Sequence, residues 1–381
     1  MKKILFVTES LNIGGMEKEL VVLANALSNR GYNITIVLYA TNDEDNLEKQ
    51  LDSKVRIIHR KRRPLRIRRK LPYFHRFYRG DKWEKRASAK TLYKYYVGKE
   101  KYDVEIAFYR GPSIKIISGS TNKYSKKLAW VHTDFKLCDP KSIMKFFNDM
   151  EEVKNAYKKF DSIATVSNMA GESFKELIGC HEKVQTIYNM IPVQEIQRKR
   201  NELCLENKER FTFITVGRFI DAKGYDRLLR IVKRLNGDGF LFDIWFVGYG
   251  RNESDLRKYV EENRLYNVKF LGYQENPYKY MKKADVFVCS SIREGFSLVV
   301  AEAMACGLPI LSTKCTGPTE ILENGEYGML VENNELALYE GLKMCILNQN
   351  LIAEFRRGSL TRCKDFDVSK IMNQIINFIE R

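Results

Sequence analysis

Short apolar runs alternate with amphipathic helical stretches along this chain, and the alternation begins twice. The first series has an apolar run at residues 3–8, a glycine-containing loop, a helical stretch at 17–29 and a second apolar run at 34–39. This β-α-β order is typical of parallel strands joined by a crossing helix. After a polar segment the alternation restarts near residue 211. The pattern predicts an α/β protein with two Rossmann-like domains, each built on a doubly wound parallel sheet.

The domain limits follow from this restart. A chain of 381 residues is too long for one ordinary domain and suits two. We expect a first domain at residues 1–190, a polar linker at 191–210, a second domain at 211–364, and a C-terminal helix at 365–381 that packs back on the first domain.

Further strands and helices complete the two series. In the first domain we expect strands at 55–58, 104–108, 127–131, 162–166 and 184–187. In the second domain we expect strands at 211–216, 242–247, 268–271, 286–289 and 309–311. The expected helices there and beyond are at 225–235, 254–263, 298–305, 319–322, 335–347, 351–362 and 368–380.

Composition narrows the class of protein. No segment runs for about 18 residues without a charged side chain, so no membrane-spanning helix is expected. The apolar run at the start breaks at Thr8-Glu9, before a secretory signal would be complete. The eight cysteines form no CxxC pair, which indicates neither a zinc site nor a disulfide framework. A cytoplasmic protein is the expectation.

Ligands of open α/β sheets bind at the carboxyl ends of the strands, so the segments that follow the strands are the candidate site. After the strand at 211–216 come Gly217, Arg218 and Lys223. A guanidinium fork and an ammonium charge suit a diphosphate; a solvated loop is the alternative interpretation. The turn from Gly248 to Gly250 could admit a flat ring or a phosphate, although glycine turns are common at strand ends.

The segment from 290 to 305 carries a stronger pattern. Its helix, 298–305, is apolar on nearly every side except at Glu302, which indicates burial. We expect Ser297 to cap this helix, Gly295 to leave room beside it, and the free N–H groups at its start to face an anion. Glu294 lies before this anion site and Glu302 after it. Two acids in these positions could bind hydroxyl groups of the two sugars that flank the diphosphate of a nucleotide sugar. In isolation, Glu302 would more often be an ordinary residue of a helix start, but its position among aliphatic residues argues against that interpretation.

These residues resemble a known family. The spacing of Glu294 and Glu302, in the wording EGFSLVVAEAMACGLPIL, resembles the signature of the retaining glycosyltransferases of the GT-B fold called family 4. The loops at 217–223 and 248–250 and the turn at 316–320 follow in the family's order. In the first half, the segments Gly14-Gly15-Met16-Glu17 and Val131-His132-Thr133-Asp134 are similar to the family's GGxE loop and histidine segment. The resemblance covers nearly the whole chain and is thin from 42 to 101.

The resemblance implies a role for each matching side chain. Arg218 and Lys223 would neutralise the leaving diphosphate. Glu294 would bind hydroxyl groups of the transferred sugar, and Glu302 would bind the ribose of the nucleotide. His132 would face the transferred sugar, although a histidine at a strand end can also be purely structural.

Backbone groups complete the implied donor site. The N–H groups from Phe296 to Leu298 would bind the phosphate, and Gly15 would approach the diphosphate from the first domain. The implied donor-binding set is Gly15, Gly217, Arg218, Lys223, Gly248, Gly250, Gly295, Phe296, Ser297, Leu298 and Glu302. This sequence departs from the family at Met16, where a small residue is usual, and at Lys314-Cys315.

The implied reaction moves a hexose or N-acetylhexosamine, with retention, from a nucleotide sugar to a hydroxyl group. UDP is the expected carrier, and a lipid-linked saccharide or a cell-surface polysaccharide precursor, such as that of a capsule, is the expected acceptor. The two Asp-x-Asp triplets, Asp43-Glu44-Asp45 and Asp365-Phe366-Asp367, do not follow a strand. Neither a metal ion nor another cofactor is therefore expected.

Most of the net charge of +17 lies in one segment, from Arg60 to Lys90, where only Asp81 and Glu84 oppose the cations. Its mixture of cations and aromatic residues favours an anionic membrane surface and peripheral attachment on the cytoplasmic face. A nucleic-acid site and a plain solvated face are the alternatives for this segment, and no nucleic acid is expected as partner. For the whole chain, the alternatives are a GT-B sugar-nucleotide epimerase and a basic nucleic-acid-binding protein.

Overall fold

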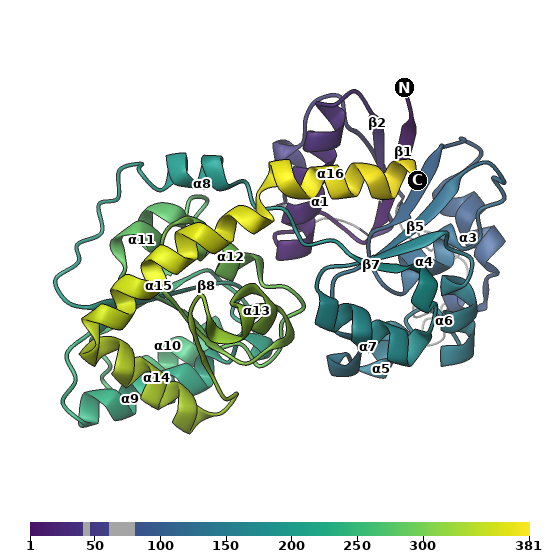
Figure 1. Cartoon of the computed structure of the whole chain (residues 1–381). Helices are drawn as coiled ribbons and strands as arrows, with labels where there is room; N and C mark the ends of the chain where they lie inside the picture. Colours follow the sequence, from purple (N-terminus) through teal and green to yellow (C-terminus); the bar gives the residue numbers. More distant parts are fainter. Residues whose placement is uncertain (41–45, 61–80) are drawn as a thin grey trace, which may run out of the picture. The chain divides into compact units, whose positions relative to one another are not determined.

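The chain forms two compact units (Figure 1). The computed structural model describes residues 1–40, 46–60 and 81–381. The first unit contains Met1–Ile187 together with Met372–Arg381, and the second contains Tyr188–Ile371. The last helix therefore contributes to both units.

The first unit is built on a seven-stranded sheet with the order β3-β2-β1-β4-β5-β6-β7. Every neighbouring pair of strands is parallel. The strands are β1 (Lys3–Thr8), β2 (Asn33–Leu38), β3 (Arg56–His59), β4 (Val104–Ala107), β5 (Lys126–Val131), β6 (Ser162–Thr165) and β7 (Val184–Thr186). Five of the six residues of β1 are fully buried, as expected for a central strand covered on both faces.

Helices connect these strands and bury the sheet. They are α1 (Gly15–Ser28), α2 (Asp81–Arg86), α3 (Ala89–Tyr96), α4 (Pro112–Ile117), α5 (Pro140–Ile143), α6 (Met150–Tyr157) and α7 (Asn168–Ile178). The end of α16 (Val368–Glu380), yellow in Figure 1, also belongs to this unit. Its Phe378 ring meets Trp130 of β5 edge to face, with ring centroids 5.7 Å apart.

The second unit is built on a six-stranded parallel sheet with the order β10-β9-β8-β11-β12-β13. The strands are β8 (Thr212–Val216), β9 (Asp243–Val247), β10 (Val268–Gly272), β11 (Val286–Cys289), β12 (Ile310–Thr313) and β13 (Met329–Val331). The strand order reverses at β8, where β9 lies on one side and β11 on the other. Ligand sites of open α/β sheets form at such a reversal.

The helices of the second unit follow its strands in turn. They are α8 (Val193–Lys199), α9 (Tyr225–Gly237), α10 (Glu253–Glu262), α11 (Tyr278–Lys283), α12 (Leu298–Ala305), α13 (Thr316–Ile321), α14 (Glu335–Leu347) and α15 (Gln349–Arg362). The helix α12 is apolar on nearly every side, and its last six residues are buried.

The predicted fold class is confirmed: two α/β units, each with a doubly wound parallel sheet. All the strands expected from the sequence are present. The sequence did not predict the strand β13, an apolar run of only three half-buried residues, or the short helix α11. The segment expected as a linker contains α8, which buries Val193 and Ile196 in the second unit. Within the described residues, no helix is long and apolar enough to span a membrane.

Candidate functional site

The loops after β8 and β9 lie against each other, and their glycines make this possible. The Gly217 N–H donates to the carbonyl of Val247 at 3.0 Å, and the Phe219 N–H donates to that of Tyr249 at 2.8 Å. A Cβ atom on Gly248 would lie 2.0 Å from the Gly217 oxygen, and one on Gly250 would lie 2.5 Å from the Phe219 oxygen. Both distances are too short for any side chain. The structure therefore gives Gly248 and Gly250 a packing reason, in addition to the ligand contact expected from the sequence.

Lys223 and Glu294 form an ion pair at the carboxyl end of the second sheet. Lys223 ends the 3-10 turn η6 (Asp221–Lys223), and its Nζ lies 2.5 Å from Glu294 Oε1. The two side chains are only 18% and 14% exposed. Burial alone would lower the pKa of Lys223, but the Glu294 carboxylate raises it above its ordinary value. Lys223 is therefore a cation at every physiological pH.

The carboxylate of Glu294 is only partly used by its neighbours. Its Oε1 accepts hydrogen bonds from the Lys223 ammonium and from the Ser291 hydroxyl, and the second bond is 2.9 Å long. Among the described residues, Oε2 accepts no hydrogen bond. One carboxylate oxygen thus remains available to a ligand while the other fixes the side chain.

A buried arginine holds the turn that carries this acid. Arg227 of α9 donates from Nη2 to the carbonyl oxygens of Ser290 and Ser291, at 2.5 and 3.0 Å. The Ser290 hydroxyl donates to the Lys223 carbonyl at 2.8 Å. These bonds join the turn after β11 to the turn after β8, so the Lys223–Glu294 pair rests on a fixed backbone. Ser291 and Arg227 were not predicted from the sequence, although the serine pair directly after a strand was a usable signal.

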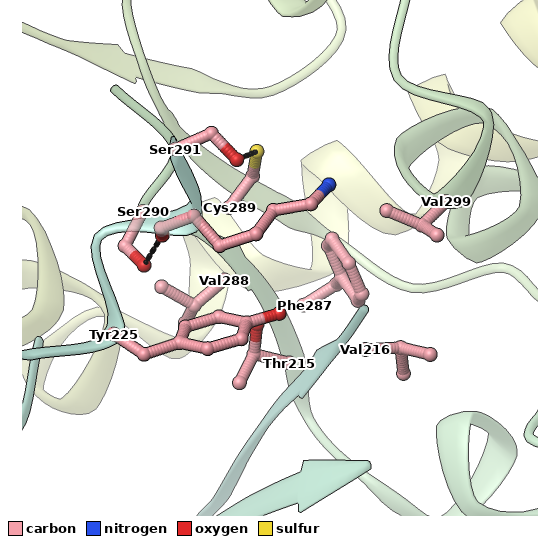
Figure 2. A pocket seen from close by; sticks show the side chains of 10 residues that line it. Thr215, Val216, Tyr225, Phe287, Val288, Cys289, Ser290, Ser291 and Val299 are labelled. Atoms are coloured by element: carbon pink, nitrogen blue, oxygen red, sulfur yellow. Dashed lines mark hydrogen bonds between the residues drawn. The ribbon is translucent and has the colours of Figure 1, made fainter. Parts of the chain in front are cut away.

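A small pocket lies beside the Lys223 side chain, which forms part of its lining (Figure 2). Thr215 and Val216 of β8, Tyr225 of α9, and Val299 of α12 contribute to its lining. Figure 2 shows the Tyr225 hydroxyl beside Thr215. Burial raises the pKa of Tyr225 to about 12, so its hydroxyl stays protonated. The lining combines apolar side chains with a few polar groups, among them the Tyr225 hydroxyl and the Lys223 ammonium.

The start of α12 differs from the predicted cap. Ser297 has a positive φ of 78°, and its side chain makes no capping hydrogen bond. The prediction was wrong here because a capping serine needs an extended backbone to reach the N–H groups of the first turn. Its Oγ is buried and has no hydrogen-bond partner within the described part of the chain. A buried hydroxyl without a partner at a helix start is a polar group that a bound anion could satisfy.

Neighbouring residues fix this helix start. Phe296 is buried, with its ring 5.4 Å from that of Phe366 and 5.9 Å from that of Tyr188. A Cβ atom on Gly317 would lie 2.0 Å from the Phe296 oxygen. The backbone at Gly317 can therefore approach Phe296 this closely only because glycine has no side chain. Gly295 and Leu298 flank Phe296 and Ser297 in this turn, as the sequence indicated.

Glu302 is buried in α12, 4% exposed, and the structure supplies its partner. The Tyr278 hydroxyl donates to Glu302 Oε1 at 3.1 Å. Tyr278 lies in α11, which the sequence did not predict, so this pair could not be found from the sequence. Arg218, in contrast, is exposed, and within the described residues its side chain forms no hydrogen bond or ion pair.

Two further predicted residues belong to the first unit. Gly15 is the first residue of α1, directly after the Gly14 cap. His132 follows β5, and its ring lies 4.5 Å from that of Phe108, measured between centroids. Both ring nitrogens are buried. Burial, and then the charge of Arg110, lower the pKa of His132 to about 3, so the ring is neutral at physiological pH.

The membrane-binding prediction falls mostly outside the described residues, because the segment from Arg60 to Lys90 includes 61–80. Arg60 itself donates from Nε to the Tyr96 carbonyl at 3.2 Å. Residues 43–45 of the first Asp-x-Asp triplet are likewise outside. Among the described residues, no group of three or more His, Cys, Asp or Glu side chains could hold a metal ion.

Comparisons with known proteins agree with this arrangement. Residues 13–195 match the family described as Glycosyltransferase Family 4, and residues 195–359 match the family described as Glycosyl transferases group 1. A Haemophilus influenzae protein named uncharacterized glycosyltransferase is 24% identical over 378 residues, which cover 98% of this chain and 99% of that protein.

Two other similarities bear on the ligands. A Campylobacter jejuni protein is named N-acetylgalactosamine-N,N'-diacetylbacillosaminyl-diphospho-undecaprenol 4-alpha-N-acetylgalactosaminyltransferase. It is 31% identical over 202 residues, or 52% of this chain, and the chain spans only 54% of that relative's length. The crystal structure of the Anabaena protein HepE in complex with UDP-glucose has a TM-score of 0.74 at 21% identity, covering 99% of both chains. At that identity the likeness shows a shared fold.

Proposed function

Because the chain belongs to the family-4-like glycosyltransferases of the GT-B fold, we propose that it is a retaining enzyme that uses a UDP-sugar. It transfers a hexose or N-acetylhexosamine to a hydroxyl group of a lipid-linked saccharide or of a cell-surface polysaccharide precursor. The name of the Campylobacter relative, with its diphospho-undecaprenol acceptor and its alpha linkage, supports the acceptor class and the retention. The UDP-glucose in the HepE structure supports the carrier.

The observation that carries this proposal is the start of α12. Ser297 brings a buried hydroxyl without a partner to the point where the first N–H groups of the helix are free. The cation of Lys223 stands close by, held by Glu294. A nucleoside diphosphate offers the phosphate oxygens that these donors need.

Each of these residues of the second unit has a separate role in the proposed reaction. As the bond to the sugar breaks, negative charge grows on the leaving diphosphate, and Lys223, Arg218 and the helix start stabilise it. Glu294 binds sugar hydroxyls through its free oxygen. Glu302, oriented by Tyr278, binds the ribose. In the proposed route, the acceptor oxygen bonds to the anomeric carbon on the face from which the diphosphate leaves, the bond from the sugar to the phosphate breaks, and an oxygen of the leaving phosphate takes the proton of the acceptor hydroxyl.

Thermal unfolding in the presence of nucleotide sugars tests the donor site. A set of UDP-glucose, UDP-galactose, UDP-N-acetylglucosamine, UDP-N-acetylgalactosamine and GDP-mannose should contain at least one compound that raises Tm. A ligand at about 100 times its Kd stabilises the folded protein by about 2.7 kcal/mol. If none of the five compounds shifts Tm, the donor-site proposal is wrong. The anomeric configuration of the product, read by NMR, tests retention separately.

A serine pair separates ligand binding from helix capping. Ser297→Ala removes a hydroxyl that has no partner, so we expect roughly tenfold weaker UDP binding without a loss of stability. Ser88→Ala is the matched control, because the Ser88 hydroxyl caps α3 by accepting the Thr91 N–H at 3.2 Å. That variant should lose about 1 kcal/mol of stability and bind UDP normally. Unchanged UDP binding by Ser297→Ala would remove the hydroxyl from the phosphate site.

A further inference from the structure

Arg110 stands at the carboxyl end of the first sheet, beside the predicted residue His132. It follows β4, while His132 and Thr133 follow β5, and these two strands are paired. Arg110 Nη1 lies 3.4 Å from the Thr133 hydroxyl oxygen, at the long limit for a hydrogen bond. The loops after two adjacent strands therefore bring a cation and a hydroxyl together.

The charge of Arg110 has no acidic partner among the described residues. Within residues 1–40, 46–60 and 81–381, no ion pair joins it to a carboxylate. The acid that follows β1, Glu9, is already bound by Lys145 at 2.8 Å. That pair lies close to the same loop, because a Cβ atom on Gly111 would be 3.2 Å from the Lys145 oxygen. The nearby acid and base cancel each other, and the charge of Arg110 remains.

The guanidinium is also incompletely hydrogen-bonded. Its Nε is buried and has no partner in the described part of the chain. Its Cζ lies 5.3 Å from the centroid of the Tyr109 ring, which supports the planar group without satisfying an N–H. His132 is neutral and contributes no negative charge. An incompletely paired cation of this kind is costly unless an anion binds it.

We propose that Arg110 is a phosphate-binding residue of the first unit, which takes oxygens of a phosphate-bearing substrate with Thr133 at its side. The guanidinium presents a planar fork of N–H donors that matches two phosphate oxygens, and the hydroxyl can donate to a third. This inference rests on the proposed function for the presence of such a substrate. The phosphate could come from a lipid diphosphate acceptor or from the nucleotide, and the recognising chemistry is the same.

Binding to the full-length protein tests the role and identifies the source. UDP represents the nucleotide. Farnesyl diphosphate represents an isoprenoid diphosphate, and farnesol is the same lipid without the charge. Arg110→Gln keeps polar groups and removes the charge. Arg56→Gln is the matched control, because Arg56 pairs with Glu100 at the opposite end of the same sheet, where its side chain is 56% exposed.

We expect Arg110→Gln to weaken binding of one diphosphate roughly 10- to 100-fold, the usual range for hydrogen bonds to a charged group. A loss for farnesyl diphosphate, with UDP and farnesol unchanged, assigns the site to the acceptor. A loss for UDP alone assigns it to the nucleotide. Arg110→Lys should recover part of the affinity, and Arg56→Gln should retain all of it.

The proposal is overturned if Arg110→Gln, with the circular dichroism and Tm of the wild type, loses affinity for neither diphosphate. The proposal is also overturned if the wild-type protein does not bind farnesyl diphosphate and Arg110→Gln binds UDP as tightly as the wild type does. Failure of the proposed function would look different, because the wild type would then bind no nucleotide sugar in the thermal screen.

Discussion

The less exposed cations at the carboxyl ends of the two sheets, Lys223 and Arg110, have different surroundings, whereas Arg218 is exposed. In the second unit, the cation of Lys223 is paired with Glu294, and the turn that carries the acid is tied to the protein by Arg227. In the first unit, Arg110 forms no ion pair with an acid of the described ranges 1–40, 46–60 and 81–381, and burial keeps His132 neutral. The second unit therefore presents a site whose parts are fixed before a ligand arrives, whereas the first retains a charge that a ligand must balance.

The largest expected effect comes from breaking the pair in the second unit. Lys223→Met should lower kcat by about 10²- to 10³-fold, because it removes a charge that stabilises the leaving diphosphate. It should also destabilise the protein by about 1–3 kcal/mol, because Glu294 stays largely buried without its cation. Steady-state kinetics and urea unfolding measure the two effects.

The double variant Lys223→Met/Glu294→Gln separates stability from catalysis. It should recover most of the lost stability and none of the activity, since no buried charge remains but the cation is still absent. Lys314→Met is the control, because its pair with Glu332 is exposed on both sides and should contribute at most about 0.5 kcal/mol. If Lys223→Met kept wild-type turnover, the idea of a preformed donor site would fail.

A second effect, of about 2–3 kcal/mol in the free energy of unfolding, is expected from Gly317→Ala. A methyl group there would meet the Phe296 oxygen at 2.0 Å and displace the start of α12. We expect weaker UDP binding together with the lower stability. Gly237→Ala at the end of α9 meets nothing within 4 Å, so it should be neutral or slightly stabilising. Equal urea midpoints for the two variants would mean that this turn adjusts easily and is not the fixed site that the comparison assumes.

The sequence predicted the framework better than the contacts. Apolar runs and amphipathic stretches were enough to place every strand except β13 and to predict parallel sheets, because parallel strands buried on both faces have a strong local pattern. The positions of Lys223 and Glu294 were also predicted, but their pairing across 71 residues was not. Such contacts depend on how loops meet in three dimensions.

Two other residues illustrate this limit. Ser297 was expected to cap α12, and only the backbone geometry revealed that its positive φ prevents this. Arg110 lies in the stretch Phe-Tyr-Arg-Gly-Pro, which fits no motif. The proposed role depends on which side chains surround the guanidinium among the described residues, and the sequence alone does not show these neighbours.

The smallest expected effect concerns His132 and the pH dependence of the reaction. Burial and the Arg110 charge lower the pKa of His132 to about 3, so the ring stays neutral and does not titrate between pH 5 and 8. A group with a lowered pKa of this kind favours the folded state above its ordinary pKa of 6.5 and loses that preference as the pH falls toward 3. We therefore expect His132→Gln to lower kcat/KM by about tenfold while leaving the shape of the pH profile between 5 and 8 unchanged. An inflection near pH 6.5 in the wild type that disappears in this variant would show that His132 titrates during turnover. It would also show that a bound anion balances the Arg110 charge during turnover, since an unbalanced guanidinium charge beside the ring opposes its protonation. The contrast between Lys223 and Arg110 would then hold only for the unliganded protein.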